Sequence, residues 1–220
     1  MKAQIRDLGR IAYDPCTELQ RELLEQVSKG NEPDTLLLVE HDPVVTLGAG
    51  YHEANLLLSP EQFAERGVQI AHTGRGGDVT YHGPGQLVLY PIFDLTRHGK
   101  DLHLWLRSLE QAMIDLLAKL QIQARRFPPH TGVWIGNGKV AAIGIQVRKW
   151  ISMHGIALNC DNDLAPFGWI VPCGIQGHGV TSISRELSQD FTVEQAKPLA
   201  VETFQNVFGL EFEIPAPARK

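Results

Sequence analysis

Cys173 is the strongest candidate nucleophile in the sequence. It lies between a proline and a glycine in the run Ile170-Val171-Pro172-Cys173-Gly174-Ile175, a context that is rigid in its backbone and sterically open. An inert core cysteine sits more often within a periodic apolar run. Cys16 and Cys160 lie beside acidic residues, which raise the pKa of a thiol and oppose formation of the nucleophilic thiolate. The sequence therefore favours Cys173.

Three histidines are candidates to act with this thiol. His82, His154 and His178 each lie beside a glycine, and any of them could serve as the base of a cysteine hydrolase. A structural histidine is the alternative for at least two of them, and the sequence does not choose among the three.

Lys139 is a further candidate because of the residues around it. It directly follows Asn137-Gly138, a strong signal for a tight hairpin turn. A lysine at a hairpin tip is often only solvated. The strand after it contains Ala141, Ala142 and Gly144, which are too small to fill a core and indicate space for a ligand. A phosphate-binding P-loop is excluded, because valine follows Gly138-Lys139.

The stretch RGGDVTYHGPGQLVLY, residues 75–90, is the most glycine-rich part of the chain. Gly76-Gly77 and Gly83-Pro84-Gly85 flank a short predicted strand, Asp78 to Tyr81, and glycine permits both tight turns and close approach of a ligand. Backbone N–H groups would gather here with the side chains of Arg75 and His82, which suits a carbonyl, a carboxylate or a phosphate. An ordinary glycine-rich hairpin is the alternative.

Composition restricts the class of protein. The chain has 220 residues, which predicts one domain spanning residues 1–220. A formal net charge of −5 gives no general attraction to nucleic acid or to anionic lipid. No apolar run reaches membrane-spanning length, and no signal peptide is recognisable. Three widely spaced cysteines argue for a reducing compartment, which we expect to be the cytoplasm. The nine histidines lack metal-ligand spacing, so no metal site is predicted.

Hydrophobic periodicity predicts an α+β fold, because strands outnumber helices and come partly in hairpins. A helix should begin at Asp14-Pro15, and a charged turn should occupy Glu40 to Pro43. Pro198 should kink the last helix or shift its start. The predicted helices cover residues 14–30, 60–67, 102–120 and 192–208; the predicted strands cover 35–39, 44–47, 68–71, 78–81, 87–93, a hairpin over 133–147, 153–158 and 211–214.

Four ordered motifs carry a resemblance to a known family. They are RGGDVTYHGPGQLVLYPI, GKVAAIGI, HGIALN, and PCGI followed by VTSI; EHDPVVTLG upstream also fits. Together they resemble the lipoyl(octanoyl) transferases, which move an octanoyl group from acyl carrier protein to a lysine of a lipoyl domain. The resemblance covers roughly residues 36–187. It implies the fold of the biotin and lipoate protein ligases, a mixed β-sheet flanked by helices.

The resemblance also implies roles by position. Cys173 corresponds to the nucleophile that accepts the acyl group as a thioester, and Lys139 to the lysine that lowers the pKa of that thiol or moves its proton. Backbone N–H groups near Gly76-Gly77 could stabilise an oxyanion. Three segments correspond to the substrate-binding residues: Arg75, Gly76, Gly77, Asp78, Val79, Thr80, Tyr81 and His82; Ala142, Ile143 and Gly144; and Gly155, Ile156 and Ala157.

The implied chemistry starts from an activated thioester, so no ATP or other cofactor is expected. The implied partners are octanoyl-acyl carrier protein as donor, and the lipoyl domains of 2-oxoacid dehydrogenase complexes and the glycine-cleavage carrier protein as acceptors. Arg125-Arg126 and Arg148-Lys149 are candidates for a basic patch facing the acidic carrier protein. The alternatives are an ATP-dependent lipoate or biotin protein ligase of the same fold, a cysteine hydrolase, and a non-catalytic binding module.

Overall fold

The computed structural model describes residues 1–171 and 178–213 and is built on a large mixed β-sheet. Strand β1 runs parallel to β2 and to β12, and β11 runs parallel to β9, whereas the other pairs are antiparallel. In spatial order the strands are β12 (Glu211–Glu213), β1 (Lys2–Ile11), β2 (Thr35–His41), β6 (Gln86–Ile92), β10 (Ile151–Asn159), β9 (Gly138–Arg148), β8 (His130–Ile135) and β7 (Arg125–Phe127), with β11 (Gly179–Val180) on β9.

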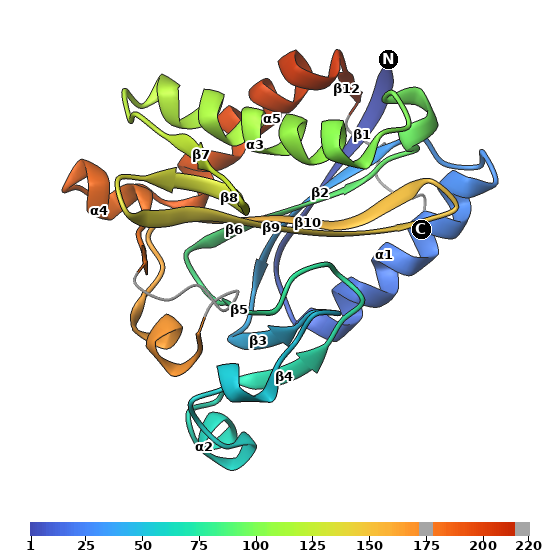
Figure 1. Ribbon diagram of the computed structural model, residues 1–220. Helices are drawn as coiled ribbons and strands as arrows, with labels where there is room; N and C mark the ends of the chain where they lie inside the picture. The colour runs from blue at the N-terminus through green and yellow to red at the C-terminus, as the bar shows by residue number, and fades with distance from the viewer. Residues whose placement is uncertain (172–177, 214–220) are drawn as a thin grey trace.

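Helices cover both faces of this sheet (Figure 1). Helices α3 (Leu102–Lys119) and α5 (Val193–Phe208) pack on one face, and α1 (Tyr13–Ser28) packs on the other. The period-2 alternation of strand side chains creates the two cores: Leu87 and Leu89 of β6 join the core beneath α3 and α5, whereas Val88 and Tyr90 join the core beneath α1. The mixed sheet and its helices confirm the predicted α+β class.

A smaller sheet lies on the α1 side of the large one (Figure 1). Its strands are β3 (Val44–Leu47), β4 (Gln69–His72) and β5 (Val79–His82), in the order β4-β3-β5, and α2 (Pro60–Glu65) packs beside them. The loop between β4 and β5 reaches back to the large sheet, where the N–H of Gly76 donates to the carbonyl of Ile145 at 2.8 Å. A space is thereby enclosed between the two sheets. The remaining short elements are η1 (Glu53–Asn55), η2 (Leu95–Arg97), η3 (Ala165–Trp169) and α4 (Ile183–Leu187).

Several predicted element boundaries were wrong, and strand β1 was missed. Its sequence KAQIRDLGRI is largely polar, because it runs near the edge of the sheet and has a register shift between Asp7 and Arg10. Helix α1 is capped by Ala12 rather than by Asp14. Strand β2 continues into the expected turn and buries His41 completely.

Helix α5 runs through Pro198 and begins directly after its Thr192 cap, so the proline does not shift its start. Pro198 lies on the exposed side of the helix, where water can hydrate the carbonyl that loses its intrahelical donor. The opposite side of α5 buries Ala196, Ala200 and Phe204 completely, and this packing stabilises the helix through the proline. Among the described residues, none of the helices is both long and apolar enough to cross a membrane.

Candidate functional site

A cavity lies between the large sheet and the loop of residues 75–77, where about 460 Å³ of space, open solvent included, is not filled by atoms. It is lined by Tyr13, Arg75, Gly76, Gly77, Thr80, His82, Val88, Tyr90, Ala142, Ile143, Gly144, His154, Gly155, Ile156 and Ala157. The structure therefore brings together three segments that lie far apart in the sequence. All the predicted substrate-binding residues line this cavity except Asp78, Val79 and Tyr81.

Val79 and Tyr81 point away from the cavity because side chains alternate along a strand, whereas Asp78 precedes the strand. Thr80 and His82 of β5 face the cavity, whereas Val79 and Tyr81 belong to the core of the smaller sheet. The Asp78 carboxylate accepts from the backbone N–H of His52 at 3.1 Å and from the side-chain amide of Asn55. Asp78, Val79 and Tyr81 therefore do not line this cavity, and their expected part in substrate binding stays a prediction.

Two opposed glycines let the walls approach closely. Gly144 of β9 pairs with Gly155 of β10. A Cβ on Gly144 would lie 2.8 Å from the carbonyl oxygen of Gly76, and one on Gly155 would lie 2.2 Å from that of Leu89. Both positions require glycine because backbone atoms occupy the space a side chain would need. The small residues thus serve loop packing as well as the cavity.

The Arg75 guanidinium fixes the loop that roofs the cavity. It donates to four oxygens: the Thr46 carbonyl at 2.7 Å, the Thr46 hydroxyl at 2.9 Å, the Asp78 carbonyl at 2.9 Å and the Gly76 carbonyl at 3.1 Å. The side chain is almost completely buried. Its planar fork matches several acceptors at once, so Arg75 organises the turn that carries Gly76 and Gly77. The N–H of Gly76 is already bonded to Ile145, so this one of the expected donors is not free for an oxyanion.

His82 is held as a neutral ring at the cavity wall. Its Nδ1 lies 2.8 Å from Oε1 of Gln86, whose amide nitrogen donates to the carbonyl of Tyr81 and to Oδ1 of Asn159. Because Oε1 can only accept, Nδ1 of His82 carries the proton and Nε2 accepts from the Thr46 hydroxyl at 3.3 Å. Burial lowers the pKa of His82 to about 3. Such a ring is a poor general base at neutral pH.

His154 lies at the other end of the cavity from Lys139. It is buried, and burial together with the nearby Arg75 charge lowers its pKa to about 4. His178, the third candidate, lies apart from both: its Nδ1 contacts Oδ1 of Asn137, and its ring meets that of Trp134 at 5.5 Å. Of the three histidines, His178 is the one placed near Lys139.

Lys139 is buried rather than solvated, although it lies next to the hairpin turn. Its Nζ lies 5.0 Å from the ring centroid of Trp134, a cation–π geometry. Strand β11 covers it, with Val180 paired to Lys139. The alternative of a merely solvated hairpin tip does not hold.

Three hollows meet at Lys139. A narrow one shares Thr80, Ala142 and Ala157 with the cavity between the two sheets and so joins that cavity to the lysine. One opening toward solvent is lined by Trp134, Leu164, Phe167, Gly168, His178, Gly179 and Val180. Another passes between Leu106 of α3 and the segment Pro129-His130-Thr131. Lys139 thus stands between an internal cavity and two surface openings.

Cys173 lies outside the described residues, as do the other residues of 172–177. The chain around that segment is placed: the N–H of Val171 donates to the carbonyl of Asn55 at 2.8 Å, and the N–H of Gly179 to that of Asn137 at 3.3 Å. The described chain after residue 177 therefore lies beside Lys139, where Gly179–Val180 pairs with Gly138 and Lys139.

The other two cysteines are unsuited to nucleophilic chemistry. Cys16 and Cys160 are completely buried, and burial raises the pKa of each thiol to about 12. The expected direction is confirmed, but burial rather than neighbouring acids is the main cause. The acidic neighbours add to it only for Cys160, through Asp161 and Glu40.

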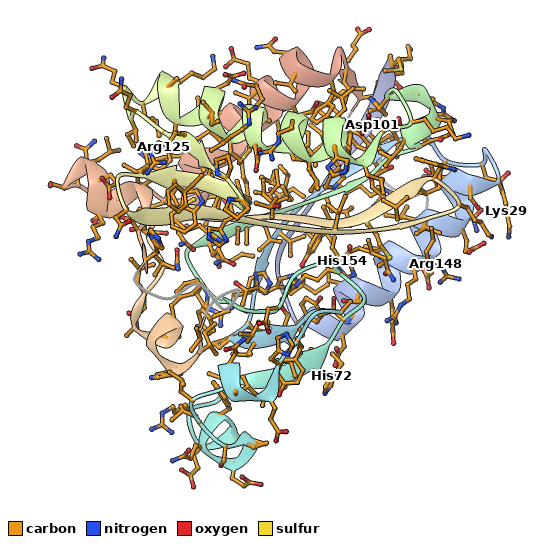
Figure 2. All side chains as sticks on the ribbon, in the orientation of Figure 1. Lys29, His72, Asp101, Arg125, Arg148 and His154 are labelled. Atoms are coloured by element: carbon orange, nitrogen blue, oxygen red, sulfur yellow. The ribbon has the colours of Figure 1, made fainter. Side chains whose placement is uncertain are left out.

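The two expected basic pairs lie at opposite ends of β9 (Figure 2). Arg126 is bonded to the buried carboxylate of Glu110, and Lys149 pairs with Glu25 at 3.0 Å. Arg125 lies at the Lys139 end, where it donates to the Gly136 carbonyl and stacks over Phe127. Of these four basic residues, Arg125 is thus the best placed to contact a partner protein at the two surface openings beside Lys139.

Sequence reasoning missed two tyrosines of the cavity. Tyr13 comes from the first turn of α1, and Tyr90 lies two residues after Val88 on the same face of β6. The Tyr90 hydroxyl lies 2.8 Å from Nε2 of His41, whose Nδ1 donates to the Ile11 carbonyl at 2.9 Å. Strand alternation could have revealed Tyr90, whereas Tyr13 has no local signal.

Comparison with known proteins decides the family. The family model described as the lipoyl protein ligase A/B catalytic domain matches residues 13–205. The chain belongs to this family. It is 47% identical over 205 residues to a protein of Citrifermentans bemidjiense named octanoyltransferase, covering 93% of this chain and 97% of that one. It is 45% identical to an octanoyltransferase of Gloeobacter violaceus, covering 93% of this chain and 90% of that one.

Solved structures show the same fold at low sequence identity. A putative lipoate protein ligase of T. acidophilum with bound lipoic acid has a TM-score of 0.74 at 16% identity, over 98% of this chain and 89% of that one. A lipoate-protein ligase A bound with ATP has a TM-score of 0.74 at 15% identity, over 98% and 89%. A biotin protein ligase of Aquifex aeolicus has a TM-score of 0.52 at 11% identity, over 95% of this chain and 69% of that one. The expected ligase-like fold is confirmed.

Proposed function

We propose that this protein is an octanoyltransferase that moves an octanoyl group from acyl carrier protein to a specific lysine of lipoyl domains. The observation that carries the proposal is the cavity with apolar side walls that leads to a buried lysine, in a chain 47% identical to octanoyltransferases over nearly its whole length. The cavity suits a saturated chain, since its walls are formed by residues such as Val88, Ala142 and Ala157.

The proposed reaction has two acyl transfers. The Cys173 thiolate attacks the thioester carbonyl of the donor, and the carrier thiol leaves as the acyl-enzyme thioester forms. The lysine amine of the lipoyl domain then attacks that thioester, an amide forms, and the Cys173 sulfur leaves as a thiolate. A thioester becomes an amide, so the overall transfer is downhill and consumes no ATP. This would be the first step of endogenous protein lipoylation.

Lys139 is proposed to set the thiolate fraction of Cys173. A free thiol has a pKa of about 8.5, and an ammonium nearby favours the thiolate. The Trp134 ring and strand β11 limit the positions open to the Lys139 side chain. The same amine can take the proton that the incoming lysine must lose. The two groups would titrate as a coupled pair.

The donor and acceptor proteins are proposed to be octanoyl-acyl carrier protein, and the lipoyl domains of 2-oxoacid dehydrogenase complexes and of the glycine-cleavage carrier protein. Two surface openings at Lys139 are consistent with two partners that must each bring a reactive group to the same place. Arg125, exposed at this end of β9, offers positive charge to an acidic carrier.

Intact-mass measurement after mixing with octanoyl-acyl carrier protein tests the function. We expect a gain of one octanoyl group on Cys173 that hydroxylamine removes, in wild type and in Cys16→Ala but not in Cys173→Ser. Label on Cys160, or ATP–pyrophosphate exchange with octanoate in place of acylation by the carrier, would contradict the proposal. The second result would instead indicate a ligase.

The pH dependence of Cys173 alkylation by iodoacetamide tests the role of Lys139. Lys139→Ala should shift the alkylation curve to higher pH, each unit being about 1.4 kcal/mol of lost thiolate stabilisation. Lys139→Arg keeps the charge but does not readily release a proton, so it should preserve alkylation better than acyl transfer. Superimposable curves for wild type and both variants would refute the pair, and His178 would become the next candidate.

A further inference from the structure

His154 departs from the regular geometry of its strand. Side chains of β10 alternate between the two faces of the sheet, and Ile156 and Leu158 belong to the core beneath α3 and α5. Strict alternation would send His154 to that core as well. Instead its backbone is left-handed, with φ of 58°, and the ring lines the cavity on the α1 side, 6.3 Å from the ring of Tyr90. Figure 2 shows it beneath the large sheet.

The imidazole carries an unused hydrogen-bonding atom. His154 is 2% exposed, and within the described residues its Nδ1 has no hydrogen-bond partner. A side chain of α1 instead supports the backbone: the N–H of His154 donates to Oε1 of Gln20 at 2.9 Å. A buried polar atom without a partner is costly, and a left-handed residue that is not glycine adds to that cost. Such a combination is typical of functional positions.

The position of His154 along the sheet defines which part of a ligand would meet it. Ala142 pairs with Ala157, Gly144 with Gly155, and Ile145 with His154. Lys139 lies three residues before Ala142 on β9, so the lysine and the histidine stand at opposite ends of the cavity. An acyl group whose carbonyl reacts at the Lys139 end would direct its last carbons toward His154.

We propose that His154 is a specificity residue that favours eight-carbon acyl chains bearing an oxygen or sulfur atom on their last carbons over the plain hydrocarbon chain. A methyl end leaves Nδ1 without a partner, whereas a hydroxyl or a sulfur can pair with the ring. The side walls, formed by residues such as Val88, Ala142 and Ala157, contact methylene groups and do not distinguish the two chains. The inference rests on the proposed function, because that function sets the direction of the chain.

The probes are N-acetylcysteamine thioesters of octanoic, 8-hydroxyoctanoic and lipoic acid, which hide the carboxylate that a free acid could place near Arg75. Dissociation constants are measured by calorimetry with Cys173→Ala as background, and kcat/KM with the intact enzyme. In His154→Phe the preference for the 8-hydroxyoctanoyl over the octanoyl thioester should fall about fivefold, the equivalent of one hydrogen bond. Val88→Ala, on the side wall, should change both thioesters by the same factor and leave the preference as it was.

His154→Asn covers the case in which the phenylalanine variant does not fold, because asparagine tolerates the left-handed backbone. Its shorter side chain withdraws from the cavity, so the preference should fall as in His154→Phe. The lipoyl thioester shows whether the His154 ring donates or accepts, because its sulfur can only accept a hydrogen bond whereas a hydroxyl can do both. If the variant loses its preference for both the lipoyl and the 8-hydroxyoctanoyl thioester over the octanoyl thioester, the ring atom is an N–H donor. If it loses the preference for the 8-hydroxyoctanoyl thioester alone, the ring atom is an acceptor. An unchanged preference in folded His154→Phe or His154→Asn would overturn the inference. Because binding is measured without transfer, its outcome is separate from failure of the transferase activity.

Discussion

Replacing Arg75 by lysine tests whether this residue organises the roof of the cavity or contacts the ligand. The substitution keeps the positive charge and removes the planar fork of donors. In the structure that fork serves four oxygens, contributed by Thr46, Gly76 and Asp78. Arg75 is only 8% exposed, so water cannot readily replace the lost donors.

The expected loss of stability follows from the number of oxygens left without a donor. A lysine ammonium has three protons at a single point and cannot span the distance between the Gly76 and Thr46 carbonyls as the guanidinium does. One or two of the four acceptors would remain buried and unsatisfied, and each costs about 1–3 kcal/mol. We therefore expect Arg75→Lys to lower the free energy of unfolding by ~3 kcal/mol.

Urea denaturation followed by circular dichroism measures this change, with acyl transfer assayed on the same preparations. Arg148→Lys is the matched control, because Arg148 is exposed at the far end of β9 and its replacement should change stability by less than about 0.5 kcal/mol. Arg75→Lys should lose both stability and transfer. Unchanged stability with transfer abolished would refute the structural role and show that the guanidinium acts on the ligand instead.

Two further predictions follow from the cavity. Gly144→Ala places a Cβ 2.8 Å from the Gly76 carbonyl oxygen, so the loop that roofs the cavity must move. The kcat/KM for octanoyl transfer should then fall at least tenfold, while the far-ultraviolet circular dichroism spectrum stays unchanged. Wild-type kinetics would show that the loop can move without loss of activity. The free energy of unfolding should decrease on acidification from about pH 6.5, because the lowered pKa values of His82, about 3, and His154, about 4, leave the unfolded chain binding more protons. His82→Gln should flatten this pH dependence in urea titrations at pH 4 to 7, and an equally steep profile would contradict the assignment.

The sequence by itself indicated the walls of the site. Glycine and alanine side chains, which are too small to fill a core, indicated residues 142–144 as a place for a ligand. Asn137-Gly138 correctly predicted the hairpin that carries Lys139. These signals are local, since turn geometry and small side chains act over a few residues. Period-2 and 3.6 patterns likewise predicted most strands and helices, but not β1, whose polar residues reflect a position near the sheet edge.

Only the tertiary structure decided which side chains meet. Tyr13, Tyr90 and His154 form part of one cavity although they come from α1, β6 and β10, and no local pattern specifies that encounter. Lys139 looks solvated in the sequence, yet Trp134 and the pairing of β11 enclose it. Arg75 looked like a ligand contact, and in the structure its guanidinium also binds oxygens of its own loop and of strand β3. Burial and hydrogen-bond pairing depend on elements distant in the chain, and for that reason they are settled only when the sheets and helices pack.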